Sequence, residues 1–147
     1  MKEHAASEAA ARRLHGEWIA AWNGRDAARL AALVGPDGII IGFDGSEMRG
    51  PNEVATAIGA VFAHHQTRPY VAIVREVRPL GMDAALLHAA TGMPGASGEA
   101  INPAVNAVQS LVAERIDGEW RIALFQNTPA AFHGRPAAAA ALTAELT

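Results

Sequence analysis

Apolar residues near the start of the chain recur every four positions and predict an amphipathic helix over residues 6–22. Leu14, Trp18 and Trp22 fall on one stripe of this helix, so we expect both indole rings to face the interior. An Asn-Gly pair ends the helix, and Asp26 beyond it is a suitable N-cap for a second, shorter helix. The start of the chain is therefore expected to form a helical hairpin.

A short buried strand and a third helix are expected next. Three consecutive isoleucines between glycines predict the strand over residues 38–43, and Asp44 opens the Asp-Gly turn that follows it. Pro51 suits the first position of the helix. Phe62 and His65 fall on the apolar stripe of that helix, so both side chains are expected to face inward.

The pattern changes to long extended segments after Pro69. Four strands are predicted, over residues 70–80, 82–93, 104–117 and 119–128. An Asp-Gly pair between the last two segments is the signal of a type I′ hairpin, which makes these two strands antiparallel neighbours.

This order of elements, three helices in the N-terminal half and then a run of strands, predicts an α+β fold. Strands of this length should form a strongly curved, mostly antiparallel sheet that curls over the helices like a cone. The half-open cavity of such a cone, lined by aromatic side chains, is the usual form of a small-molecule site. We expect a single domain over residues 1–130, followed at 131–147 by an alanine-rich tail or short helix that packs little.

Composition and charge narrow the possible partners. The 147 residues carry 12 Lys plus Arg against 15 Asp plus Glu, a net charge of -3, which predicts no surface for nucleic acid. The chain shows no signal peptide and no stretch near the roughly 20 apolar residues that span a bilayer, which predicts a cytoplasmic protein with no membrane partner. The absence of cysteine excludes disulfides and thiolate ligands.

No cofactor and no metal site are predicted. Neither the dinucleotide fingerprint G-x-G-x-x-G nor the P-loop pattern occurs, and no strand-helix-strand unit exists to carry one. His64 and His65 are adjacent, but neighbours on a helix point about 100° apart. No further ligand lies one turn away to complete a chelate.

Several short motifs lie at the ends of the predicted elements. They are Trp-Asn-Gly-Arg-Asp at residues 22–26, Asp-Gly-Glu-Trp-Arg-Ile at 117–122 and Phe-Gln-Asn-Thr at 125–128. With these motifs the chain resembles the nuclear-transport-factor-2-like superfamily, which includes ketosteroid isomerase, scytalone dehydratase and the SnoaL polyketide cyclases. The Gln-Asn-Thr ending narrows the resemblance to the SgcJ/EcaC group, found with enediyne and other natural-product clusters. Pro129 stands where that group often has arginine.

The resemblance covers residues 8–129 and implies a cone-shaped fold. It also implies a cofactor-free apolar pocket for a hydrophobic small molecule, and a homodimer packed through the outer face of the sheet. It does not imply a particular reaction.

Two residues are candidates for moving a proton in such a pocket. His88 shares one face of its predicted strand with small neighbours, which leaves room for a ligand if that face lines the cavity. Otherwise His88 lies at the dimer face or in the core. Asp44 follows the buried strand and is a candidate general base, although an Asp-Gly pair is first of all a turn signal.

Polar residues on the last two strands are candidates for holding a ligand oxygen. Strict alternation places Gln126 with the more apolar face of its strand and Asn127 on the outer face. Gln126 then either holds a ligand oxygen or satisfies buried backbone groups. Asn106 and Gln109 fall on opposite faces of the preceding strand, so only one of them belongs inside, and the pattern does not decide which.

Aromatic residues complete the candidate site. Trp18, Trp22, Phe43 and Phe62 either form plain core or stack against a flat ligand, and Tyr70 is a candidate donor at the rim. Two functions follow. The first is a cofactor-independent isomerase, cyclase or dehydratase, with His88 or Asp44 moving the proton. The second is a non-catalytic protein that binds a hydrophobic ligand or serves as a dimeric accessory subunit.

Overall fold

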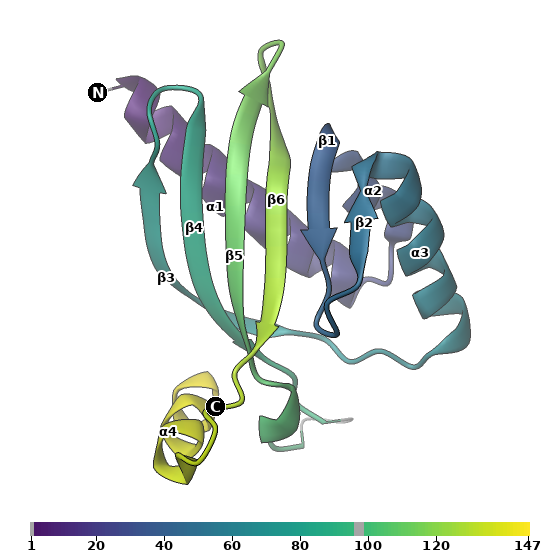
Figure 1. The fold of residues 1–147 in the computed structure, drawn as a ribbon, viewed down its shortest axis with the longest axis vertical. Coiled ribbons are helices and arrows are strands. Elements are labelled where there is room, and N and C mark those ends of the chain that lie inside the picture. Colours follow the sequence, from purple (N-terminus) through teal and green to yellow (C-terminus); the bar gives the residue numbers. More distant parts are fainter. Residues whose placement is uncertain (1, 96–98) are drawn as a thin grey trace.

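A computed structural model describes residues 2–95 and 99–147 (Figure 1). Its helices are α1 (Lys2–Asn23), α2 (Ala27–Ala32), α3 (Gly50–His64) and α4 (Pro136–Leu146), with a 3₁₀ turn, η2, at Pro103–Val105. Its strands are β1 (Val34–Ile41), β2 (Glu47–Arg49), β3 (Val71–Pro79), β4 (Ala84–Gly92), β5 (Ala107–Ile116) and β6 (Glu119–Pro129). The strands form one curved sheet in the order β2-β1-β6-β5-β4-β3, which confirms the predicted α+β fold.

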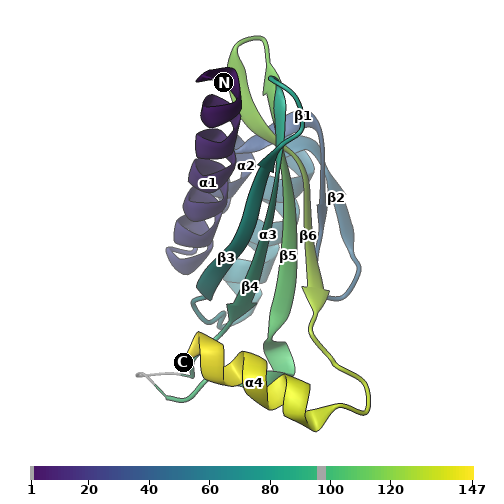
Figure 2. The same ribbon diagram turned by 90° about the vertical axis from the view of Figure 1, so that its left-hand side faces the viewer.

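Helix α1 lies along the inner face of the sheet, where it contacts β3, β4 and β5 (Figure 2). Leu14 and Trp18 of α1 are buried against that face, as the four-residue spacing predicts. The helix ends at Asn23, and the Asp26 side chain then accepts a hydrogen bond from the backbone of Arg29 to begin α2. The helical hairpin is therefore confirmed.

All neighbouring strands of the sheet are antiparallel except β1 and β6, which are parallel. Asp117 and Gly118 both have positive φ, 50° and 80°, which confirms the type I′ hairpin between β5 and β6. Strand β1 is longer than predicted and runs parallel to β6, so residues from the N-terminal half lie beside the last strand. The short strand β2 was not predicted, because three residues are too few to show a period.

A β-bulge in β6 reverses the expected faces of its last residues. The register pairs Val112 with Leu124 and Ala113 with Ile122, so Ala123 has no partner on β5. Strict alternation fails at that extra residue. Asn127 therefore lies on the inner face and is buried, whereas Gln126 is exposed on the outer face, so both sequence predictions for these two residues were wrong.

His88 also lies on the face opposite to the one that would line a cavity. The inner face of β4 is formed by Ala85, Leu87 and Ala89, each 0 % exposed. His88 is half-buried on the outer face, where it stands in register between Glu76 of β3 and Ser110 of β5. The sequence left the face of His88 open, because apolar residues occupy both faces of this strand and show no alternation to choose between them. The candidate role of His88 in moving a proton in a cavity does not agree with this position.

Helix α3 ends before its predicted apolar stripe does. His64 is its last residue, and His65 is exposed beyond it rather than turned inward. The backbone oxygens of Phe62 and His65 accept hydrogen bonds from the Arg25 guanidinium, which lies over the Phe62 ring. Arg25 thus supplies donors to carbonyl groups that the end of the helix leaves unpaired.

Helix α4 packs more closely than its alanine-rich sequence predicts. It crosses one end of the sheet, where Leu142 and Leu146 are buried in a second apolar cluster with Ala90 of β4 (Figure 2). Arg75 of β3 and Glu145 form a two-pronged ion pair at 2.7 and 3.0 Å. The expected short terminal helix is therefore present, but it packs against the sheet more than expected.

Gly38 provides a test of the junction between β1 and β6. A Cβ atom at this position would lie 2.5 Å from the Ile122 backbone oxygen and 2.7 Å from Val34 Cγ1. Gly38→Ala is expected to lower the free energy of unfolding by about 1–3 kcal/mol, because the backbone cannot move aside without breaking the strand pairing. Gly16→Ala is the control: nothing lies within 4 Å of its Cβ position in α1, so we expect a gain of about 0.5–1 kcal/mol. Urea unfolding of both variants measures the difference, and an unaltered Gly38→Ala midpoint would contradict the close approach.

Candidate functional site

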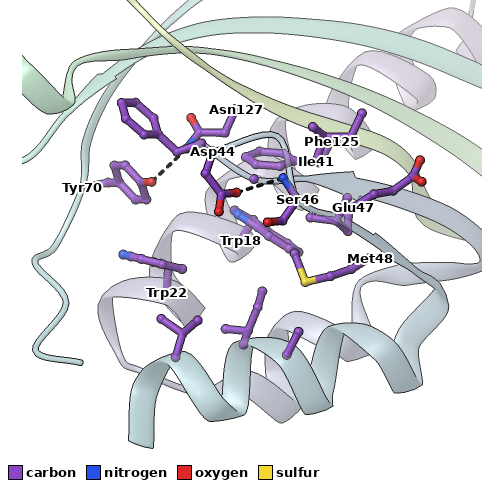
Figure 3. Close-up of a pocket in the computed structure, with 16 residues that line it drawn as sticks. Trp18, Trp22, Ile41, Asp44, Ser46, Glu47, Met48, Tyr70, Phe125 and Asn127 are labelled. Atoms are coloured by element: carbon purple, nitrogen blue, oxygen red, sulfur yellow. Dashed lines mark hydrogen bonds between the residues drawn. The ribbon is translucent and has the colours of Figure 1, made fainter. Parts of the chain in front are cut away.

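A cavity of about 440 Å³ opens between α1, α3, the β1–β2 turn and β6 (Figure 3). Most of its lining is apolar, and the polar groups lie at its mouth or on one wall. The lining residues are Trp18, Trp22, Ile40, Ile41, Gly42, Phe43, Asp44, Ser46, Glu47, Met48, Ala57, Ile58, Val61, Tyr70, Phe125 and Asn127.

Aromatic rings that contact one another in pairs form part of the cavity wall. The ring centroids of Trp18 and Phe125 are 4.8 Å apart with a tilt of 31°, and those of Trp22 and Tyr70 are 5.5 Å apart. Phe62 packs edge-on against Trp22 at 5.2 Å and does not line the cavity. Such tilted and edge-on contacts are favourable, so the rings hold one another in place without a ligand.

The motif at the end of α1 positions Tyr70. The Asn23 side chain accepts a hydrogen bond from the Tyr70 backbone N–H at 2.8 Å and donates one to the Tyr70 carbonyl at 3.1 Å. The Trp22 indole N–H donates to the carbonyl of Arg68, and Arg25 donates to the Thr67 hydroxyl. These bonds fasten the segment between α3 and β3, which has no regular structure of its own, to the end of α1.

A chain of polar side chains joins the core to Tyr70. His15 Nε2 lies 2.9 Å from Gln109 Oε1, and Gln109 Nε2 donates to Asn127 Oδ1 at 3.3 Å. Asn127 Nδ2 then donates to the Tyr70 hydroxyl at 3.1 Å (Figure 3). His15, Gln109 and Asn127 are 2, 0 and 7 % exposed, so these bonds satisfy groups that water does not reach.

Burial keeps both ends of this chain uncharged near neutral pH. Desolvation lowers the pKa of His15, and the hydrogen bond to Gln109 opposes this shift only in part. Desolvation raises the pKa of Tyr70 above its ordinary value, against the smaller effect of the bond from Asn127. The chain therefore links a neutral imidazole to a neutral phenol.

Asp44 lies at the mouth of the cavity and is exposed. The Ser46 backbone N–H donates to Asp44 Oδ1 at 2.9 Å, and this bond is the main reason that the pKa of Asp44 is lowered. Glu47 lies beside it and pairs with Arg49 at 3.3 Å. Asp44 lies in the β1–β2 turn and Glu47 is the first residue of β2. Because Glu47 is paired with Arg49, the negative charge at the mouth comes from Asp44.

Comparison with known proteins places this architecture in a family. Residues 12–127 match the family model of the SnoaL-like domain. The chain belongs to the SnoaL-like family. This family lies within the nuclear-transport-factor-2-like superfamily, so the superfamily resemblance is confirmed. No curated protein matches the sequence.

Solved structures share the SnoaL-like fold at low sequence identity. A domain of unknown function with a cystatin-like fold from Nostoc punctiforme PCC 73102 is 23 % identical, with a TM-score of 0.81 over 89 % of this chain and 82 % of that one. A ketosteroid isomerase-like protein from Erwinia carotovora is 18 % identical, with a TM-score of 0.65 over 84 % and 95 %. An NTF-2 like protein of unknown function from Shewanella oneidensis MR-1 is 18 % identical, with a TM-score of 0.63 over 79 % and 93 %.

The structure places only some of the candidate residues of the sequence at the cavity. Trp18, Trp22, Phe43 and Tyr70 line the cavity, and Asp44 stands at its mouth. The other candidates lie elsewhere: His88 and Gln126 on the outer face, Phe62 behind Trp22, and Asn106 near α4, where its amide donates to Thr143 Oγ1.

His15 was not among the candidate residues of the sequence, and Asn127 was expected on the outer face of the sheet. A signal for His15 was present, since it lies three residues before Trp18 and so falls beside the buried stripe of α1. Among residues 2–95 and 99–147 no cluster of His, Asp and Glu is suited to hold a metal ion. No helix in these ranges is long and apolar enough to cross a membrane.

The lowered pKa of His15 predicts a specific pH dependence of stability. Between this lowered value and the ordinary value of 6.5, the unfolded chain binds a proton that the native chain does not, so stability rises with pH across that interval. Wild type is therefore expected to lose more stability between about pH 7.5 and pH 5.5 than His15→Gln, which cannot titrate. His133→Gln, at an exposed histidine, is the control and should behave like wild type. Thermal unfolding at both pH values measures this, and equal losses in wild type and His15→Gln would contradict the lowered pKa.

Proposed function

We propose that this protein binds a small, flat, hydrophobic molecule in the cavity between α1, α3 and β6. The observation that carries the proposal is the lining: a mostly apolar space of about 440 Å³ with Trp18, Trp22 and Phe125 in its walls. A space of this size lies within the range of small-molecule sites and admits a ligand of two or three fused rings. The aromatic walls offer stacking contacts to such a ligand.

Binding without turnover agrees best with the chemistry of the lining. General acid-base catalysis works best with a group whose pKa lies near the working pH. The pKa of Asp44 is lowered and that of Tyr70 is raised, so each moves away from neutrality. His15, the residue of the polar chain with an ordinary pKa nearest neutrality, is separated from the cavity by Gln109 and Asn127.

The second candidate function is a cofactor-independent isomerase, cyclase or dehydratase. The Tyr70 hydroxyl on one wall and the Asp44 carboxylate at the mouth are the donor and base that favour it. The ketosteroid isomerase-like neighbour shares the fold with which this chemistry is associated. Since His88 and Gln126 lie on the outer face, a reaction in this cavity would depend on Asp44 instead, and Asp44→Asn would abolish it.

The motif at residues 126–128 supports a more specific ligand class. Gln-Asn-Thr resembles the SgcJ/EcaC group of natural-product clusters, and its asparagine is the residue that contacts Tyr70 at the cavity wall. We therefore propose a polyketide-like or enediyne-like intermediate as the ligand.

Filling the cavity tests the binding proposal. Ala57 and Ala60 are both exposed residues of α3, but only Ala57 lines the cavity. Ala57→Phe is expected to weaken binding of the neutral fluorescent probe N-phenyl-1-naphthylamine by roughly tenfold or more, because the added ring occupies the space of the probe. Ala60→Phe is the matched control and should bind like wild type. A fluorescence titration measures all three affinities, and equal affinity of the two variants would place the probe outside this cavity.

We further propose that two copies pair through the outer face of the sheet. Leu86, Val112 and Leu124 lie on that face and remain partly exposed, and α4 covers only the end of the sheet beyond them. The superfamily resemblance supports a homodimer with this geometry.

A charge on the outer face tests the pairing. Val112→Lys is expected to convert the dimer to a monomer, because a lysine facing its own copy across a two-fold axis leaves charges without partners. Arg12→Glu on the exposed side of α1 is a control that should leave the mass unchanged. Sedimentation velocity gives both masses, and a monomeric wild type would refute the proposed homodimer.

A further inference from the structure

The chain of side chains from His15 to Tyr70 is the polar part of an otherwise apolar inner face. Gln109 lies on β5 beside Leu111, and both side chains are fully buried. An apolar residue would fill the same position without the cost of burying an amide, so packing alone does not account for glutamine there. The Gln109 amide instead bonds through both its oxygen and its nitrogen, and the last residue of the chain, Tyr70, lines the cavity.

The hydrogen bonds of this chain all run in the same direction. The Gln109 carbonyl oxygen can only accept, so the proton between it and His15 belongs to His15 Nε2. The Gln109 amide nitrogen then donates to Asn127, whose own amide nitrogen donates to Tyr70. Each amide has its oxygen toward α1 and its nitrogen toward the cavity, so each bond strengthens the next.

The Tyr70 hydroxyl is therefore left with a proton to donate. Its oxygen accepts from Asn127, and within residues 2–95 and 99–147 the hydroxyl has no acceptor for its own hydrogen. Tyr70 is fixed by the two backbone bonds to Asn23, and it lines the cavity. Asn127 lines the same wall and has a second amide hydrogen.

We propose that the His15–Gln109–Asn127 chain holds the Tyr70 hydroxyl as a hydrogen-bond donor, so that the cavity selects flat aromatic molecules bearing a neutral ketone or quinone oxygen. This inference rests on the proposed binding function and names the ligand class within it. A neutral oxygen is favoured over a carboxylate because the exposed carboxylate of Asp44 places negative charge at the mouth. Gln109 acts through Asn127 and is a positioning residue.

Two probes of the same shape test the selection. 2-Acetylnaphthalene carries a ketone, and 2-isopropenylnaphthalene has a methylene group in place of the oxygen. Wild type is expected to bind the ketone about two- to tenfold more tightly, the usual net effect of one hydrogen bond. Tyr70→Phe should bind the two probes with equal affinity, because the hydroxyl that distinguishes them is gone. Competition against N-phenyl-1-naphthylamine gives the four affinities.

A second set of measurements tests the role of the buried residues. Gln109→Leu is expected to lose the preference for the ketone while keeping its affinity for the hydrocarbon. A merely structural defect would instead lower the affinity for both probes. Leu111→Val, on the same strand and face, is the control and should keep the preference. In wild-type protein, ¹⁵N NMR should find His15 as the Nε2–H tautomer. This measurement needs no variant, so it tests the proposal even if Gln109→Leu does not fold.

The possible outcomes separate this inference from the function on which it rests. If wild type binds both naphthalenes equally, or if His15 is the Nδ1–H tautomer, the directed chain is overturned while the binding function survives. If wild type binds neither naphthalene nor N-phenyl-1-naphthylamine, the binding function fails and the inference fails with it. A ketone preference that Tyr70→Phe and Gln109→Leu both remove would support the proposal.

Discussion

Close packing of α1 on an alanine-lined sheet face is the contact on which the rest of the molecule depends. Ala85, Ala89 and Ala113 are fully buried on that face, and their small side chains let the helix approach the strands. Toward the C-terminal end of α1, Trp18 and Trp22 replace small side chains with large ones. These two large rings form part of the wall of the cavity.

The polar residues near the cavity follow from the same constraint. A helix so close to the sheet excludes water, and a polar group in that layer must find its partner within the protein. His15 and Gln109 satisfy each other there, and Asn127 connects them to Tyr70. The segment that carries Tyr70 has no regular structure, and the Asn23 side chain bonds to it much as a neighbouring strand would.

The sequence was most informative where a signal is local. The end of α1, the cap of α2 and the hairpin turn at Asp117 each depend on residues within a few positions, and each was predicted correctly. The sequence did not predict which residues of β4 and β6 face inward. In β4 an apolar run shows no alternation, and in β6 a single bulge at Ala123 reverses the faces of the residues that follow it. The polar chain joins α1 to the β5–β6 hairpin and to the segment before β3, and 94 positions separate His15 from Gln109, so no local pattern predicts that these two residues will meet.

The parallel pairing of β1 with β6 bears on how the protein is made. Strand β1 lies inside the sheet between β2 and β6, so one of its edges has no partner until the last strand is added. The ribosome releases β6 after all the other strands, since domains emerge from the N-terminus. One edge of β1, with its isoleucines, therefore has no strand partner through most of synthesis. The cavity, whose walls include both β1 and β6, therefore cannot close before β6 is in place.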